Sequence, residues 1–317
     1  MKKMIVATAI LLSATTSAWA QSWPERPVTL VVPYTAGAVT DVFGRHLANA
    51  LQEHWGQPVV VENRPGGGSM LGSAHVARSA PDGYTLLVTT SAIVTSPAVL
   101  SDIPFDPRAD LQPIGLTGYI PMVFVGGPST EGATLTEFVA EARERPLFAA
   151  TAGLGTTTHF TVEMLIQAAG IEMDVVHYGG GGEAIVAVMG GHADIYASTP
   201  ASSLDHIRNG TLRGLGVAGD SRTTVLPDVA STDELGFEGV NASFWLGVLA
   251  PGGISEETAA YINESMNAVL ENPAMQEQLA AFDLQVVTTT VEEFDAQVET
   301  ELESWAELAR ERGLSGN

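Results

Sequence analysis

The first third of the chain alternates short β-branched runs with stretches of helical spacing. Runs at 28–33, 58–63 and 82–90 each predict a strand, because Val, Leu and Thr dominate short segments bounded by turn-forming residues. Between them, apolar residues recur at helical spacing over 41–55, and 71–79 predicts a shorter helix. This alternation predicts a parallel sheet with helices on both faces.

The same alternation restarts in the middle of the chain and then gives way to helices. The second unit has predicted strands at 121–127, 146–151, 173–178, 193–198 and 212–219, and predicted helices at 134–145, 155–170 and 182–191. A third block has a predicted strand at 244–251 and predicted helices at 255–272, 273–282 and 291–312.

Two α/β units followed by a mainly helical C-terminal block predict two lobes, with the C-terminal block completing the first. We expect lobe 1 to comprise residues 21–121 and 228–317, and lobe 2 to comprise residues 122–227. Because ligands of such sheets bind at the carboxyl ends of strands, the cleft between the lobes is the expected site.

The N-terminus has the pattern of an export signal. Lys2 and Lys3 precede an apolar run at 4–12, and "AWA" at 18–20 is a small-x-small cleavage site. We expect residues 1–20 to be a signal peptide that is cleaved after Ala20. Apart from this segment, no stretch approaches the roughly 18 apolar residues that a membrane span needs.

Composition excludes several classes of function. The chain has no cysteine, which excludes thiol catalysis. Its formal net charge is −23, and removal of residues 1–20 with their two lysines leaves −25. This balance argues against nucleic acid and against an anionic membrane surface as partners, because both need clustered Lys and Arg. Solubility is the simplest explanation for the excess of acidic residues.

Two glycine-containing loops are candidates for anion binding. In "YTAGAVTDVFGR" (34–45), a loop around Gly37 leads from a strand into a helix whose first N–H groups have no helical partner. An ordinary turn capped by Thr40 or Asp41 explains this loop equally well. "TAGLGTTTH" (151–159) repeats the arrangement, with Thr156, Thr157 or Thr158 as the expected helix N-cap.

Other motifs give weaker signals. Gly179-x-Gly181-x-x-Ala184 resembles a dinucleotide fingerprint, but the nearest later acid, Asp194, lies inside a predicted strand. A tight turn at the cleft explains these glycines better. "RPGGGS" at 64–69 lacks the Gly-Lys-Ser/Thr ending of a phosphate-binding loop.

The sequence contains no assembled catalytic or metal-binding motif. It has neither Gly-x-Ser-x-Gly nor His-Glu-x-x-His, and among seven histidines only His192-x-Asp194 approaches metal-ligand spacing. A surface loop explains that pair better, and a structural role is the simpler interpretation of His159. We therefore predict no catalytic residue, no metal and no cofactor.

The chain resembles the substrate-binding proteins of tripartite tricarboxylate transporters, the Bug family. The resemblance runs in order over essentially the whole mature chain. It is carried by "WPERPVTLVVPYTAGAVTD", "VENRPGGGSMLG", "APDGYTLL", "FDPRADLQPI", "GGGEAIVAVMGGHADI", "LRGLGVAGDSR", "LPDVASTDELGF", "FWLGVLAPGGI" and the tail "ENPAMQEQL…EEFDAQVETELESWAEL".

The resemblance implies an α/β, two-lobed periplasmic binding protein of type II, the Venus-flytrap class. Such a protein is a monomer without enzymatic activity or cofactor. It captures a small organic carboxylate, whether a di- or tricarboxylate, an acidic amino acid or an aromatic carboxylate. It then delivers the ligand to the large and small membrane subunits of the transporter.

The family's ligand-binding positions carry over residue by residue. In the family, the first loop and the Gly/Ser/Thr loop of the second lobe hold carboxylates, largely through backbone N–H groups and water. The implied ligand-binding residues are Tyr34, Thr35, Ala36, Gly37, Ala38, Asp41, Thr90, Ser91, Thr151, Gly153, Gly155, Thr156, Thr157, His159, Tyr178, Gly181, Ser198 and Thr199.

The chain departs from the family pattern at a few positions near these residues. Ala38 replaces the second glycine of the first loop, and Leu154 replaces a polar residue of the second. His177 and Gly179 replace a proline and a lysine. If Leu154 faces the pocket, it favours a ligand with an apolar body.

Two alternatives to a transport receptor are left open. One is an exported enzyme acting on a small carboxylate, with Asp41 or His159 as its acid or base. The other is a receptor that presents its ligand to a sensor protein.

Overall fold

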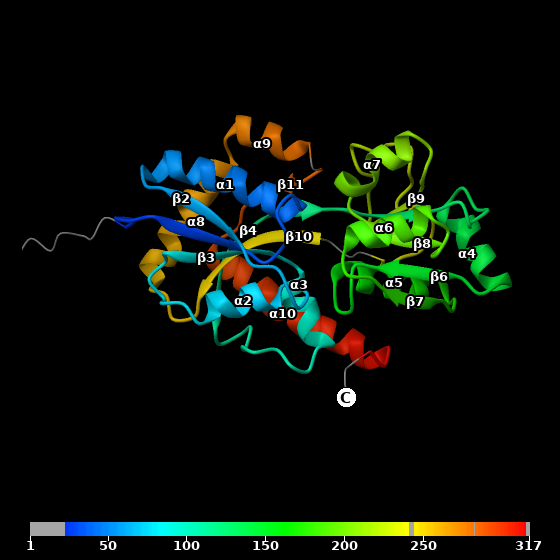
Figure 1. Cartoon of the computed structure of the whole chain (residues 1–317), viewed down its shortest axis with the longest axis horizontal. Coiled ribbons are helices and arrows are strands. Elements are labelled where there is room, and N and C mark those ends of the chain that lie inside the picture. The colour runs from blue at the N-terminus through cyan, green and yellow to red at the C-terminus, as the bar shows by residue number, and fades with distance from the viewer. Residues whose placement is uncertain (1–22, 241–243, 282, 315–317) are drawn as a thin grey trace, which may run out of the picture.

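The computed structural model of the chain describes residues 23–240, 244–281 and 283–314 (Figure 1). The expected signal peptide and its cleavage site lie outside the described residues. Within the described residues, no helix combines the length and apolar character needed to cross a membrane.

The first sheet has the strand order β11-β4-β10-β3-β1-β2. Its strands are β1 (Val28–Val32), β2 (Val59–Asn63), β3 (Thr85–Thr90), β4 (Leu111–Ile120), β10 (Phe244–Pro251) and β11 (Gln285–Val286). The helices grouped with it are α1 (Val39–Trp55), α2 (Met70–Ala77), α3 (Ala92–Thr95), α8 (Glu256–Leu270), α9 (Pro273–Ala280) and α10 (Val291–Glu311), with a 3₁₀ turn at Ser96–Ala98. We call this unit lobe 1.

The second sheet has the order β7-β6-β8-β5-β9 and forms lobe 2, the green half of Figure 1. Its strands are β5 (Met122–Gly126), β6 (Phe148–Thr151), β7 (Asp174–His177), β8 (Ile195–Ser198) and β9 (Arg213–Ala218). Its helices are α4 (Leu135–Glu144), α5 (Thr157–Ala169), α6 (Gly181–Met189) and α7 (Pro200–Arg208).

Each sheet has an apolar cluster on both faces, as the continuous apolar strands predict. In β1, Leu30 and Val32 belong to one core cluster and Val31 to another. In β5, Phe124 and Val123 divide in the same way between the two clusters of lobe 2. Because side chains alternate across a strand, an unbroken apolar run fills both faces.

The sheets are mixed, whereas the sequence predicts parallel ones. β10 runs antiparallel to β3 and β4, and β5 runs antiparallel to β8 and β9. The reason is that the chain passes straight from β4 of the first sheet into β5 of the second, with Pro121 between them, and returns through β10. The prediction of purely parallel sheets was therefore wrong for these crossing strands.

β4 was not predicted, because its sequence contains residues that usually interrupt strands. A Cβ on Gly115 would lie 2.3 Å from the Met266 side chain, and one on Gly118 would lie 2.5 Å from the Gln285 carbonyl oxygen. The glycines therefore allow α8 and β11 to pack closely against this strand. Tertiary packing, and not local propensity, makes this segment a strand.

α3, α7 and β11 also lie outside the predicted elements. α7 begins with Pro200 at its first turn, the position that proline favours. The predicted end of lobe 2 after residue 227 falls before a segment that still contacts the second sheet. Val217 N–H donates to the Ala230 carbonyl, and Val240 packs in a lobe 2 core cluster.

The lobes contact each other through specific side chains. Ser91 Oγ, after β3, lies 2.7 Å from Thr157 Oγ1 at the start of α5. The Arg312 guanidinium, after α10, lies 2.8 Å from the Glu163 carboxylate of α5. Phe160 of α5 packs on Trp305 of α10 with ring centroids 4.9 Å apart. One edge of the interlobe cleft is thus held by α5 and α10.

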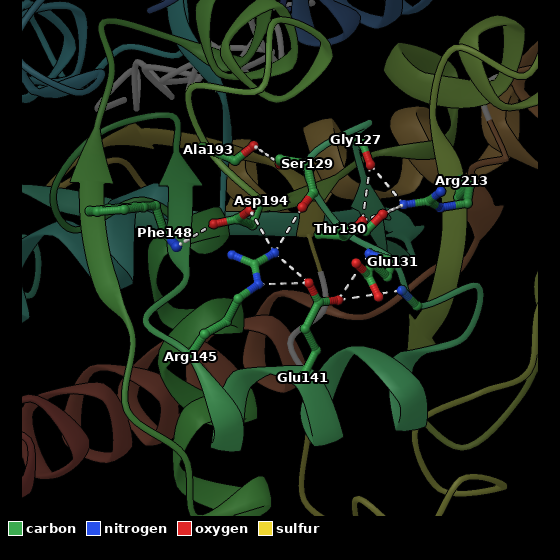
Figure 2. Close-up of polar contacts among 11 residues, drawn as sticks. Gly127, Ser129, Thr130, Glu131, Glu141, Arg145, Phe148, Ala193, Asp194 and Arg213 are labelled. Atoms are coloured by element: carbon green, nitrogen blue, oxygen red, sulfur yellow. Dashed lines mark hydrogen bonds and ion pairs between the residues drawn. The ribbon is translucent and has the colours of Figure 1, made fainter.

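Asp194 belongs to a structural network in lobe 2 (Figure 2). Its carboxylate accepts the Phe148 N–H at 2.7 Å and lies 3.7 Å from the Arg145 guanidinium, which also donates to Glu141. Its side chain is only 6% exposed. These partners explain Asp194 without a metal or a nucleotide ribose.

We predict that Asp194→Asn lowers the free energy of unfolding by about 1–3 kcal/mol, because a buried charge-assisted hydrogen bond is lost. Chemical denaturation measures this difference. The control is His192→Ala, which alters the exposed partner of the His192-x-Asp194 pair. Stabilisation of the wild type by added zinc that vanishes in both variants would contradict the structural role.

Candidate functional site

A cavity of about 640 Å³ lies where the carboxyl ends of six strands meet. Lobe 1 contributes the segments that follow β1, β2 and β3, and lobe 2 contributes the ends of β6, β7 and β8. Phe244, at the start of β10, completes the lining. The volume is in the usual range for a small-molecule site.

The N-termini of five helices converge on this cavity. Their N-cap residues line it: Ala38 of α1, Ser69 of α2, Thr156 of α5, Gly180 of α6 and Thr199 of α7. Among these, only Thr156 makes a side-chain cap hydrogen bond, to the His159 N–H. A helix N-terminus carries unpaired N–H donors and about half a positive charge, so the cavity is suited to an anion.

No lining residue in the described part of the chain is Asp, Glu, Lys, Arg or His. The two lining phenols, Tyr34 and Tyr196, are neutral at neutral pH as ordinary tyrosines are, and burial raises the pKa of both further. Tyr34 Oη lies 2.6 Å from Thr90 Oγ1. Positive potential at this site therefore comes from backbone dipoles rather than from charged side chains.

Asp41 fixes the first loop from a position outside the cavity lining. Its carboxylate accepts the Gly37 N–H at 2.8 Å and the Asn63 amide at 2.8 Å, and it pairs with Arg45 at 2.9 Å. Burial alone would raise the pKa of Asp41, but the hydrogen bonds from Arg45, Gly37 and Asn63 outweigh burial and lower it. The expectation that Thr40 or Asp41 caps α1 was wrong, since Ala38 is the N-cap and has no side-chain cap bond.

The second loop is fixed by the first turn of α5. Thr158 Oγ1 accepts the Ala152 N–H at 2.8 Å, and His159 Nδ1 accepts the Gly155 N–H at 3.3 Å. The sequence predicted an N-cap among three threonines, and Thr156 occupies it. Both loops are thus held by a side chain from the helix that follows.

The predicted ligand-binding residues divide into two groups. Ten line the cavity: Tyr34, Thr35, Ala36, Gly37, Ala38, Thr90, Thr156, Thr157, Gly181 and Thr199. The remaining eight are outside its lining: Asp41, Ser91, Thr151, Gly153, Gly155, His159, Tyr178 and Ser198. Contact of either group with a ligand stays a prediction.

Several of the eight residues outside the lining have structural partners. Ser91 bonds to Thr157 across the lobes, and Thr151 Oγ1 lies 2.7 Å from His177 Nδ1. Ser198 Oγ donates to the Thr199 carbonyl at 3.0 Å. Ser91 and Ser198 therefore support lining residues, whereas the partner of Thr151, His177, is itself outside the lining.

Other lining residues were not among the predicted set. They are Pro33, Val39, Thr40, Pro65, Gly66, Gly67, Gly68, Ser69, Ala92, Ala152, Thr158, Gly179, Gly180, Gly182, Tyr196, Ser202 and Phe244. Two of these could have been predicted to lie near the site, because ligands bind at the carboxyl ends of strands. "RPGGGS" follows one predicted strand, and Tyr196 lies near the end of another. Phe244 has no such signal, because it is the first residue of its strand and does not lie at the carboxyl end.

The departures from the family pattern occupy different places. Ala38 and Gly179 line the cavity, whereas Leu154 is 40% exposed and is absent from the lining. His177 bonds to Thr151 and packs edge-on against His159, with ring centroids 4.7 Å apart. The preference for an apolar ligand that was attributed to Leu154 therefore has no basis in the lining.

The groups that the enzyme hypothesis requires are engaged elsewhere. Asp41 and His159 are both absent from the lining, and each accepts a backbone N–H of its own loop. His159 Nε2 also lies 3.7 Å from the Glu163 carboxylate. Among the described residues, no group of three or more His, Asp or Glu side chains is placed to hold a metal ion.

Comparison with known proteins agrees with this architecture. The family model "tripartite tricarboxylate transporter family receptor" matches residues 43–314. Protein BugT of Bordetella pertussis is 34% identical over 299 residues, covering 93% of this chain and 91% of BugT. The structure of periplasmic binding protein BugD is 29% identical with a TM-score of 0.82, covering 93% of this chain and 100% of BugD.

A further similar structure contains a ligand. It is that of R. palustris Rpa4515 with adipate, which has a TM-score of 0.86 and 28% identity. The match covers 93% of this chain and 100% of that protein. The fold is that of a two-lobed periplasmic binding protein.

We predict that Asp41→Asn lowers the free energy of unfolding at neutral pH by about 1–2 kcal/mol, because the charge-assisted bonds to the first loop weaken. The pKa of Asp41 is lowered on folding. Its contribution is therefore complete above the unfolded value of about 3.9 and is lost as pH falls through the folded pKa. The difference between wild type and variant should shrink below about pH 4.

Urea unfolding between pH 3 and pH 7 measures this difference. The control is Asp295→Asn, which changes an exposed residue of α10. A difference between Asp41→Asn and the wild type that widens as the solution is acidified would contradict the assignment.

Proposed function

Because the chain belongs to the tripartite tricarboxylate transporter receptor family, we propose that it is a periplasmic receptor for a small organic carboxylate. It binds the ligand without chemical change and delivers it to the large and small membrane subunits of a tripartite transporter. It is exported through its N-terminal signal and acts as a monomer.

The convergence of helix N-termini is the observation that carries this proposal. Outside the cavity lining, the N-caps of α4, α8, α9 and α10 all make side-chain cap bonds, from Thr134, Ser255, Asn272 and Thr290. The four-residue helix α3, with Ser91 as its N-cap, is the exception. At the cavity, four of five helices lack such a cap. The first N–H groups of α1 and α6 make no hydrogen bond within the described residues, whereas Met70 and Leu71 of α2 donate to the carbonyls of Gly67 and Gly66. The donors of α1 and α6 are therefore available to a carboxylate, which is also the chemistry of the adipate found with Rpa4515.

Residues of both lobes line the cavity, so a bound ligand bridges them. Thr157 joins ligand binding to lobe contact, because it lines the cavity and bonds to Ser91 of the other lobe. A ligand that contacts both lobes favours the closed arrangement by its differential affinity for it.

We predict that small carboxylates raise the Tm of the mature chain, whereas their amides do not. The backbone donors are arranged for negative charge, and a ligand at 100 times its Kd adds about 2.7 kcal/mol of stability. A thermal-shift panel of mono-, di-, tri- and aromatic carboxylates, each paired with its amide, measures this. Equal stabilisation by acids and amides would contradict the proposal.

A glycine pair tests the location of the site. A Cβ on Gly181 would lie 2.9 Å from Tyr196 Oη, whereas a Cβ on neighbouring Gly182 would meet nothing within 4 Å. We expect Gly181→Ala to weaken ligand binding by about fivefold, of the order of 1 kcal/mol. Gly182→Ala, at a neighbouring lining residue where the added Cβ meets no protein atom, is the comparison for steric strain. Calorimetric titration in which neither variant changes ligand affinity would place the ligand elsewhere.

A further inference from the structure

The loop before α1 in lobe 1 and the loop before α6 in lobe 2 are built alike. In the loop before α1, Asp41 accepts the Gly37 N–H at 2.8 Å. In the loop before α6, Glu183 accepts the Gly179 N–H at 3.0 Å. In each case the acid lies four residues after the glycine, in the first turn of the helix. Each acid places a negative charge beside a helix N-terminus.

The two acids differ in how their charge is balanced. Asp41 pairs with Arg45 at 2.9 Å and accepts a hydrogen bond from Asn63. Glu183 is exposed, and its carboxylate makes no ion pair with any residue in the described ranges. The attraction of the α6 N-terminus for an anion is therefore opposed by Glu183, whereas that of α1 is retained.

Tyr196 of β8 places a hydroxyl at the α6 end of the cavity. The residue is 4% exposed and lines the cavity, and its Oη has no hydrogen-bond partner among the described residues. Its position beside α6 follows from the 2.9 Å that would separate Oη from a Cβ on Gly181. Tyr34, the other lining phenol, already has Thr90 as its partner.

Because Tyr196 lines the cavity and its Oη makes no hydrogen bond within the described residues, a ligand in the cavity can supply the partner of this hydroxyl. Burial raises the pKa of Tyr196, and the phenol therefore keeps its proton and can donate. A second carboxylate at this position would be desolvated beside Glu183 without a cation to balance it. A hydroxyl or carbonyl oxygen would accept the hydrogen bond without that penalty.

We propose that Tyr196 and the N-terminus of α6 form a subsite for an uncharged hydrogen-bonding group at the end of the ligand opposite its carboxylate. Glu183 excludes a second carboxylate from this subsite. The inference rests on the proposed function and names its substrate class, which is monocarboxylates with a distal hydroxyl or carbonyl group. The carboxylate itself binds at the first loop, between α1 and α5.

The probes are adipate, hexanoate and 6-hydroxyhexanoate, which share one chain length and differ only in the distal group. The same three kinds of acid at the chain length of succinate and at that of suberate cover shorter and longer ligands. One of the three chain lengths is expected to bind the wild type most tightly. At that length, we expect the hydroxy acid to bind about tenfold more tightly than either the alkyl acid or the diacid. Calorimetric titration of the mature chain measures all three.

Two variants assign the effect to its residues. Tyr196→Phe should remove the difference between the hydroxy acid and the alkyl acid. Glu183→Gln should raise the affinity for the diacid about fivefold to tenfold, because the opposing charge is gone. The control for charge is Glu271→Gln, at an exposed residue that is absent from the cavity lining.

The outcomes separate this inference from the function on which it rests. If the diacid binds most tightly at every length and Glu183→Gln does not change its affinity, the subsite is wrong while carboxylate binding stands. Equal weakening of all three end groups by Tyr196→Phe also overturns the subsite. If no acid in the carboxylate panel binds the wild type, both the proposed function and the subsite fail.

Discussion

The architecture depends on how backbone N–H groups are left available at helix N-termini. A side-chain cap contributes about 1 kcal/mol to a helix, and α4, α8, α9 and α10 each have one. Around the cavity, Ala38 and Gly180 have no side-chain group able to cap, and Ser69 and Thr199 do not use theirs. These helices therefore lack the stabilisation of a side-chain cap at the positions where a ligand can accept hydrogen bonds from their N–H groups. The same feature thus sets both a local weakness of the fold and the chemistry of its ligand.

Without cations in the lining, small differences in the surrounding charges decide which part of a ligand lies where. Asp41 and Glu183 both hold a glycine N–H, but only Asp41 has an arginine beside it. Arg45 leaves the α1 N-terminus free to attract an anion, although the chain as a whole is strongly acidic. Because salt screens charges beyond about 10 Å, these neighbours matter more for affinity than the net charge does.

The sequence predicted the parts of the fold that depend on local pattern. Apolar runs such as Val28–Val32 gave the strands, and loops that follow parallel strands gave Thr35 to Ala38 and Thr156 as lining residues. β4 was missed because its glycines are explained only by α8 and β11, which contact it from distant parts of the chain. Phe244 and Tyr196 were missed for a related reason. Whether a strand residue reaches the cavity depends on how the lobes face each other.

Residues that share a loop can have separate roles, which the sequence alone does not distinguish. Thr157 lines the cavity, while its partner Ser91 lies behind the lining in the other lobe. Thr156 and Thr158 shape the second loop through hydrogen bonds to the backbone and to each other. A single hydroxyl cluster therefore caps α5, fixes the loop and joins the lobes. Because the Ser91–Thr157 bond crosses the lobes and Thr157 also lines the cavity, ligand affinity and lobe contact are coupled through this threonine.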